Sequence, residues 1–221
     1  MLDNFSSGPA IKGLYIDGQW HATPGQFDDL NPSDGKVWAH IPDAGAAETR
    51  RAIEAAHRAF PLWSSLRFQE RSKLMLKIAD TWDKRSQDFV IAAQFEGGGS
   101  YGKGMFEAGH VSETFRAAAG LCYGAIGEIL PSQNGKFSTA VRVPTGVVGV
   151  ISPWNVPGIL TSRGFAFAMA IGNTIVLKPS EETPYAGGLF FAEILEEAGV
   201  PNGVFNVITA SRDRTPEVGD E

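Results

Sequence analysis

Apolar residues in the first half of the chain recur every three or four positions after residue 45, which is the period of an amphipathic helix. Ile53, Ala56 and Phe60, for example, share one helical face. Met75 and Trp82 share the apolar face of a second predicted helix. The residues from 105 onward are rich in alanine. This pattern predicts helices over 46–66, around 75–82, over 86–96 and over 105–127.

Short strands are predicted on both sides of this helical region. Asp17-Gly18 and Asn31-Pro32-Ser33-Asp34-Gly35 are turn sequences between short apolar pieces, so the first forty residues predict hairpin-like β-structure. Farther along, Gly135 and Pro144 bracket residues 136–143, whose end alternates as a half-exposed strand does. We expect a β-arm there.

Residues 147–208 alternate between apolar runs and helical segments with few residues between them. The runs 147–151, 174–178 and 204–208 have the composition of strands buried on both faces of a sheet. Helices are expected over 159–171 and, after the Thr183-Pro184 start signal, over 184–199. Strands joined by helical crossovers lie parallel, so we predict an α/β fold with an open parallel, Rossmann-like sheet.

Composition and charge argue against several classes of partner and of protein. Acidic residues outnumber basic ones, 25 to 19, so no nucleic-acid or membrane partner is predicted. No apolar stretch approaches the roughly 18 residues of a spanning helix, and the start lacks the pattern of a signal peptide. With one cysteine, Cys122, the sequence predicts a cytosolic protein without internal disulfides.

Two loops follow the first two predicted parallel strands, at the sheet edge where ligands bind in such folds. Their sequences are Pro153-Trp154-Asn155-Val156-Pro157 and Lys178-Pro179-Ser180-Glu181. These loops, together with Asn31-Pro32 and the stretch 199–206, resemble the sequences of the aldehyde dehydrogenase superfamily. The resemblance extends over nearly the whole chain. The similarity is nearest to members acting on aromatic aldehydes such as benzaldehyde or vanillin.

The resemblance implies that Asn155 is a catalytic residue. In the family, the side-chain amide of this asparagine donates a hydrogen bond to the oxyanion formed when a cysteine attacks the aldehyde. In a site that excludes water, one such hydrogen bond lowers the activation barrier by roughly 3 to 4 kcal/mol. The alternative is that Asn155 only caps the helix that follows, since asparagine is a favoured cap.

The resemblance also implies an NAD site, with NADP as a second option. Lys178, Ser180 and Glu181 would hold the adenosine ribose, and the Glu181 carboxylate favours the free hydroxyls of NAD over a 2′-phosphate. The cofactor cleft would also be lined by Ile151, Ser152, Pro153 and Trp154. The alternative is that the charged residues belong to a solvated turn.

Other candidate sites are weaker. Gly97, Gly99 and Gly102 have the spacing of a dinucleotide fingerprint, but the preceding segment is helical, so no phosphate loop is expected. Cys122 lies upstream of the asparagine loop, whereas the family nucleophile lies far downstream, so a buried structural thiol is expected. The four histidines lack metal-ligand spacing, and no metal site is predicted.

The predicted organisation has three parts: cofactor-domain β-pieces and helices over 1–127, an oligomerisation β-arm over 128–146, and a partial dinucleotide-binding unit over 147–221. By resemblance this is the N-terminal half of the fold, an incomplete sheet without the catalytic cysteine and glutamate. The expected function is the N-terminal portion of an NAD(P)-dependent aldehyde dehydrogenase, an oxidoreductase that forms homo-oligomers, with no turnover by this chain alone. The alternative is a non-catalytic truncated paralogue that binds nucleotide or associates with other subunits.

Overall fold

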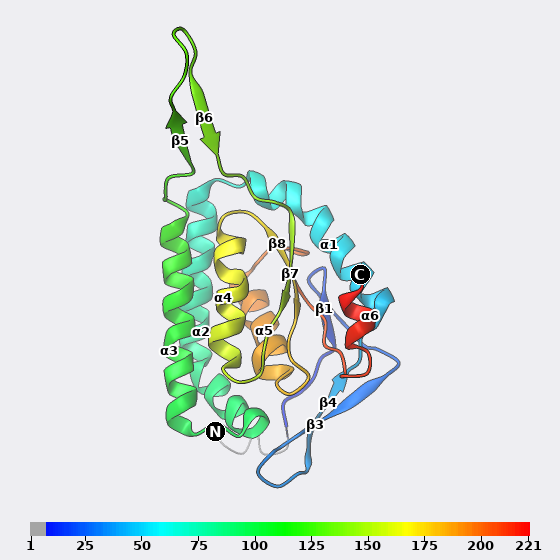
Figure 1. The fold of residues 1–221 in the computed structure, drawn as a ribbon. Coiled ribbons are helices and arrows are strands. Elements are labelled where there is room, and N and C mark those ends of the chain that lie inside the picture. Colours follow the sequence, from blue (N-terminus) through cyan, green and yellow to red (C-terminus); the bar gives the residue numbers. More distant parts are fainter. Residues whose placement is uncertain (1–7) are drawn as a thin grey trace.

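A five-stranded sheet forms the centre of the fold in the computed structural model, which describes residues 8–221. Its strand order is β2-β1-β9-β8-β7. The strands are β1 (Leu14–Ile16), β2 (Gln19–His21), β7 (Val147–Ile151), β8 (Thr174–Lys178) and β9 (Phe205–Val207). The pairs β7–β8 and β8–β9 are parallel, which confirms the predicted α/β core. Figure 1 shows the sheet between helices on both sides.

The sheet is mixed rather than wholly parallel, because the N-terminal hairpin extends it. Strand β1 pairs antiparallel with β9 through Tyr15 and Val207. The Asp17 backbone N–H donates to Oδ1 of Asn206, 2.9 Å away, which fixes the hairpin turn on β9. The sequence predicted the hairpin but not its place in the sheet, since that place depends on contacts nearly two hundred residues apart.

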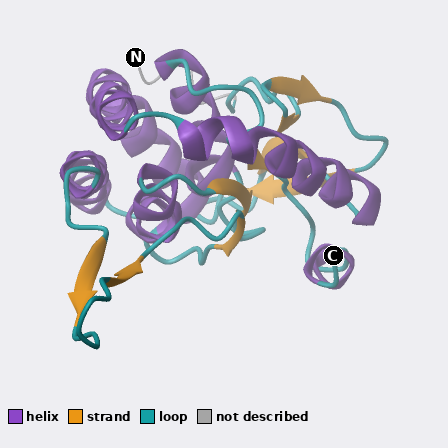
Figure 2. Cartoon of the chain, turned by 90° about the horizontal axis from the view of Figure 1, so that it is seen from above, coloured by secondary structure: helices purple, strands orange, loops and turns teal. Residues whose placement is uncertain are grey.

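Helices cover the two faces of the sheet unequally. One face carries α1 (Ala46–Ser65), with the short α6 (Thr215–Gly219) beside it. The other face carries α4 (Pro157–Ala170) and α5 (Phe190–Ala198), and α2 (Phe68–Gly97) and α3 (Tyr101–Leu121) pack outside them. Figures 1 and 2 show these layers from two directions. One main hydrophobic core therefore fills the space between the sheet and α2, α3, α4 and α5.

Three helices differ from the sequence prediction. Residues 68–97 form one helix rather than two, because no glycine or proline interrupts the chain before Gly97 and the apolar stripe continues through Phe89. The helix predicted over 105–127 runs over Tyr101–Leu121 instead. The helix after Thr183 begins as a π-helical turn, η2 (Tyr185–Leu189), before α5.

Strand β7 is an edge strand, and it is not buried on both faces as predicted. Its last residue, Ile151, is 72% exposed, whereas every residue of β8 is buried. Sequence alone gives β7 and β8 the same apolar character, but only β8 has neighbours on both sides. An apolar run therefore identified a parallel strand without showing its position in the sheet.

Two further hairpins lie outside the central sheet. One joins β3 (Gln26–Leu30) to β4 (Val37–Pro42) through the predicted turn at residues 31–35. The other joins β5 (Gly127–Leu130) to β6 (Ser138–Val141) and is the predicted β-arm, which projects away from the body in Figures 1 and 2. The three-part division at residues 127 and 146 stays a prediction.

Candidate active site

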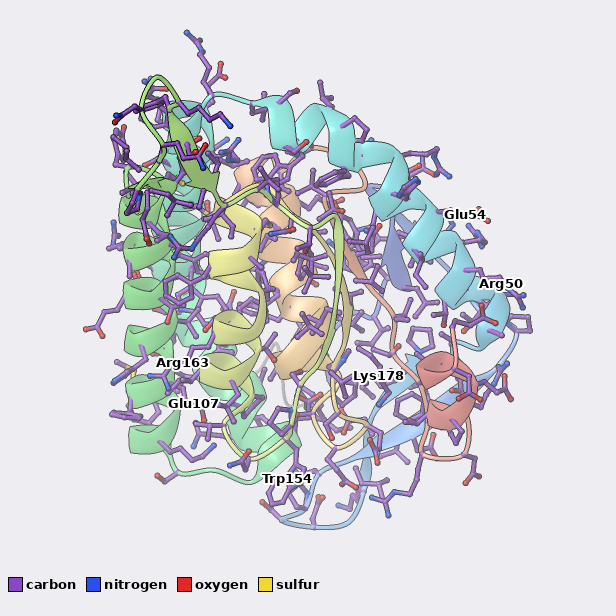
Figure 3. The ribbon with its side chains drawn as sticks, turned by 45° about the horizontal axis from the view of Figure 1, so that its top comes forward. Arg50, Glu54, Glu107, Trp154, Arg163 and Lys178 are labelled. Carbon is purple, nitrogen blue, oxygen red and sulfur yellow. The ribbon has the colours of Figure 1, made fainter. Side chains whose placement is uncertain are left out.

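The two recognised loops leave the same edge of the sheet. Ile151 ends β7 and is in register with Lys178, which ends β8. The Ser152 backbone N–H donates to the Lys178 carbonyl oxygen, 3.1 Å away, so the loops are joined where they begin. Figure 3 labels Trp154 and Lys178, one from each loop. The arrangement places an amide-bearing loop and a lysine-bearing loop beside each other.

Asn155 is exposed and does not cap the helix that follows it. The cap position of α4 is Val156, which has no side-chain acceptor, and Pro157 follows it as the first helical residue. No hydrogen bond joins the Asn155 side chain to another residue of the described chain, 8–221. Its amide therefore remains available to a ligand, and the capping alternative is wrong.

A buried glutamate from another helix caps α4 instead. Oε2 of Glu107, on α3, accepts a hydrogen bond of 2.9 Å from the Gly158 backbone N–H, and Lys103 Nζ lies 2.5 Å from Oε1. Gly158 must lack a side chain, because a Cβ there would lie 2.6 Å from Cζ of Phe89. The Asn155 loop is thus held at both ends, by β8 and by α3.

A second buried glutamate caps the helix that follows the lysine loop. Glu96, at the end of α2, accepts hydrogen bonds from the backbone N–H groups of Tyr185 and Ala186, at 2.6 and 2.7 Å. The predicted cap, Thr183, has a buried hydroxyl without a hydrogen-bond partner among residues 8–221. Glu96 and Glu107 each lie on the buried stripe of their helix, and that position was the available sequence signal.

Glu96 also contacts the buried carboxyl group of Asp29 on β3. Burial is the main cause that raises the pKa of Asp29 to about 7, and the Glu182 charge adds to it, while a hydrogen bond with Glu96 opposes it. Burial and the Asp29 charge hold the pKa of Glu96 well above its usual range. Two touching carboxyl groups away from water cannot both ionise readily, so the pair retains a proton near neutral pH.

Lys178 is a buried cation at the end of β8. Its side chain donates to the Pro179 carbonyl oxygen at 3.3 Å, and Nζ lies 3.8 Å from Oε2 of Glu181. Burial lowers the pKa of Lys178, and the Glu181 charge opposes part of that effect. The ammonium group therefore has few partners and can donate to a ligand at the sheet edge.

Glu181 and Ser180 form the rest of this loop. Burial alone would raise the pKa of Glu181, but hydrogen bonds from the backbone and Arg212, with the Lys178 charge, lower it. Glu181 is therefore a carboxylate at neutral pH. The Ser180 hydroxyl accepts a hydrogen bond from the Glu182 backbone N–H at 3.3 Å. These contacts fix the loop with its charged groups toward the sheet edge.

Three cavities lie along this edge, and the third, of ≈ 300 Å³, is lined by Asp29, Glu96 and Glu181 among others. The first, of ≈ 470 Å³, is hereafter the Arg212 cavity; its lining residues are Trp154, Ser180, Glu181, Glu182 and Arg212. The second, of ≈ 380 Å³, lies between β7, α1 and α6, and Ile151 and Lys178 line it. The hydroxyl of Ser152, in the same loop as Ile151 and Trp154, is buried and has no hydrogen-bond partner among residues 8–221. An unpaired buried polar atom in a loop that lines open cavities fits a site for a polar ligand.

The remaining candidate residues have structural roles. Gly98 adopts φ 65° and ends α2, so the glycine cluster is a helix terminus and not a phosphate loop. Sγ of Cys122 donates to the carbonyl oxygens of Ala118 and Ala170, and burial raises the pKa of the thiol, as expected for a structural cysteine. Within residues 8–221, no helix is long and apolar enough to cross a membrane, and no cluster of three or more acidic, histidine or cysteine side chains is arranged to hold a metal ion.

Comparisons with known proteins agree with this geometry. Residues 20–220 match the model of the aldehyde dehydrogenase family. The benzaldehyde dehydrogenase [NAD(+)] of Pseudomonas putida is 36% identical over 207 residues, which cover 93% of this chain and 42% of that protein.

Solved structures give the same result. A salicylaldehyde dehydrogenase from Pseudomonas putida G7 has a TM-score of 0.90 and 31% identity, over 94% of this chain and 43% of its own. An NADP-dependent enzyme of E. coli has a TM-score of 0.91 and 32% identity, over 95% of this chain and 44% of its own. The chain spans less than half the length of these relatives.

Proposed function

The chain belongs to the aldehyde dehydrogenase family, and we propose that it supplies the cofactor-binding side of an enzyme that oxidises an aldehyde to a carboxylic acid with NAD(P). The observation that carries the proposal is the joining of the two loops, through the hydrogen bond from Ser152 to Lys178, at one edge of parallel strands. Ligands in open α/β sheets bind at this edge. The names of two relatives, a benzaldehyde and a salicylaldehyde dehydrogenase, favour an aromatic aldehyde as substrate.

The residues at this edge fit a dinucleotide. Lys178, Ser180 and Glu181 would hold the adenosine ribose, because a carboxylate accepts hydrogen bonds from ribose hydroxyls and an ammonium donates to them. The buried, unpaired hydroxyl of Ser152 would gain a partner there. The exposed Ile151, Pro153 and Trp154 would form the wall of the cleft. The bound nicotinamide would supply the hydride acceptor.

Asn155 would orient and stabilise the reacting carbonyl. Its amide is exposed, and its loop is held by β8 on one side and by the Glu107 cap on the other. A donor whose position is fixed before the reaction stabilises negative charge as it develops on the carbonyl oxygen. Asn155→Ala should therefore lower turnover about a hundredfold or more in an enzyme that contains this chain.

The test has two parts. Calorimetry of this chain with NAD and NADP should detect binding, and Lys178→Ala should weaken it, with Lys77→Ala as an exposed control. Sequencing the coding DNA beyond Glu221 would show whether a glycine-rich turn, a glutamate and a cysteine follow in frame, and a product containing them should oxidise benzaldehyde. Absence of nucleotide binding, or equal turnover by the Asn155→Ala form of such a product, would contradict the proposal.

A second proposed role is subunit association through the β5–β6 arm. The arm and its base expose several large apolar side chains to solvent: Ile126, Ile129, Phe137, Val141 and Val143. Apolar groups gathered on a projecting hairpin are typical of a surface that another subunit covers. Sedimentation should show oligomers, and Phe137→Asp should shift them toward monomer; an unchanged distribution, together with no co-assembly with a full-length relative, would contradict this role.

A further inference from the structure

The outer side of β7 has backbone groups that no other strand of residues 8–221 pairs with, because β7 is the last strand of the central sheet. The Ser152 N–H, just after this strand, donates to the Lys178 carbonyl oxygen of β8. Successive residues of a strand direct their N–H and C=O groups to opposite sides, so the even-numbered residues of β7 bond to β8. Val147, Gly149 and Ile151 therefore direct their N–H and C=O groups away from the sheet.

Strand β7 lacks the features that usually keep an exposed edge from pairing. Such edges are normally short, charged, bulged or interrupted by proline. Strand β7 consists of valine, isoleucine and one glycine, and its pairing with β8 continues in one register from end to end. The opposite edge strand, β2, is only 3 residues long and contains Gln19 and His21. Of the two edges of the central sheet, β7 is therefore the one that can accept a further strand.

Gly149 provides a centre about which two copies of this edge are complementary. It is exposed, and a Cβ built on it would have nothing within 4 Å. A glycine inside a strand often marks a place where another backbone approaches closely. A two-fold axis through Gly149, perpendicular to the sheet, makes two β7 strands antiparallel and sets Val147 of one copy opposite Ile151 of the other. In this register every outward N–H and C=O group of the three residues has a partner.

The side chains of the same edge are also self-complementary. Ile151 is exposed, and beside it lies the cavity of ≈ 380 Å³ between β7, α1 and α6, whose lining is mainly apolar. Pairing about Gly149 places Ile151 of each copy against Val147 and this cavity of the other copy, as a β-branched cross-strand pair. The charged side chains in the lining, Lys178 and Glu221, have opposite signs. Two identical surfaces of this kind therefore bring together no excess of like charge.

We propose that the outer edge of β7 is an interaction surface for a second copy of this chain, which pairs with it antiparallel about Gly149 and joins the two central sheets into one. The same residues of both copies form the contact, so it closes on itself and leaves no free edge at β7. The β5–β6 arm projects from another part of the molecule, so the two contacts can be tested separately (Figure 1). The inference does not depend on the proposed cofactor site.

The experiment places charges at the two-fold axis, in a Phe137→Asp background that disrupts the apolar surface of the arm. Sedimentation velocity over a range of concentrations should show a monomer–dimer equilibrium. We expect Gly149→Lys and Gly149→Glu each to weaken dimerisation about fivefold or more, because like charges directly opposite each other destabilise a strand pair. An equimolar mixture of the two variants should dimerise more tightly than either alone, since a lysine then lies opposite a glutamate. The matched control is Gly109→Lys, at an exposed glycine of α3 that also has nothing within 4 Å of an added Cβ.

Hydrogen exchange gives a second measurement that does not depend on charged substitutions. The amides of Val147, Gly149 and Ile151 should become protected as the protein concentration rises, whereas those of Val148 and Val150, which bond to β8, should be protected at every concentration. A monomer at all concentrations, no difference between the Gly149 variants and the control, or no gain in the mixture would overturn the inference. Dimers that form without protecting the three outward amides would overturn it as well. Circular dichroism melting checks that each variant remains folded.

Discussion

Replacing Asp29 with asparagine should remove a pH dependence from the stability of this chain. Asp29 is buried against Glu96, and its pKa is raised from 3.8 to about 7. In the unfolded chain the same carboxyl group ionises near its ordinary value. Between these two values the folded state binds more protons than the unfolded state, so stability falls as pH rises through that interval.

The size of the effect follows from the interval. Each pH unit within it changes the free energy of unfolding by about 1.4 kcal/mol per titrating group. As the pH rises from 5 to 7, the titration of Asp29 therefore lowers the free energy of unfolding by about 2 to 3 kcal/mol. Asparagine has the shape of aspartate, donates a hydrogen bond to Glu96 at every pH, and does not titrate. Between pH 5 and pH 7, the free energy of unfolding of Asp29→Asn should therefore rise by that amount relative to that of the wild type.

Urea unfolding of wild type and Asp29→Asn at pH 5, 6 and 7, followed by tryptophan fluorescence, measures this difference. Asp213→Asn is the control, because it makes the same substitution at an exposed aspartate on the β9–α6 loop. A difference between Asp29→Asn and wild type that stays constant across these pH values would refute a shared proton in the Asp29–Glu96 pair.

Three further stability predictions, the last with a matched control at a second glycine, can be tested by urea or thermal unfolding. Glu107→Leu should cost about 2 to 3 kcal/mol, because the Gly158 backbone N–H loses its acceptor away from water, and Glu107→Gln should restore most of the loss. Asn173→Ala should cost about 2 to 4 kcal/mol, since its side chain bonds to two backbone N–H groups and one carbonyl oxygen. Gly203→Ala should cost more than about 2 kcal/mol, because φ is +79° and the new Cβ would lie 2.7 Å from the Ala55 carbonyl oxygen. Gly35→Ala, at φ +69° in open space, should cost only about 1 kcal/mol.

The parallel part of the fold was predictable because its signals are local. Apolar runs, crossover helices and glycine or proline boundaries occur within a few residues of one another, and they located β7, β8 and β9 correctly. The site loops were predictable for the same reason, since strand ends can be read directly from the sequence. Their residues come together through a single backbone hydrogen bond, from Ser152 to Lys178.

Features that depend on distant contacts were not predictable. The Glu107 cap joins residues 51 positions apart, and the Glu96 cap joins residues 89 positions apart. Helical periodicity places both glutamates on buried stripes, but it does not indicate which backbone groups they meet. The antiparallel addition of β1 to β9 and the exposure of β7 likewise depend on the order of strands in space.

The first backbone amides of α4 and η2 are capped by glutamates of α3 and α2, so the exchange of these amides reports on whether α2 and α3 stay packed against them. Hydrogen exchange at Gly158, Tyr185 and Ala186 requires their N–H groups to separate from Glu107 or Glu96. Slow exchange at these amides would therefore mean that α2 and α3 remain docked, and all three should lose protection together when that helical pair moves away. Residues 147–221 should accordingly open and close as one cooperative unit with the helices that precede them.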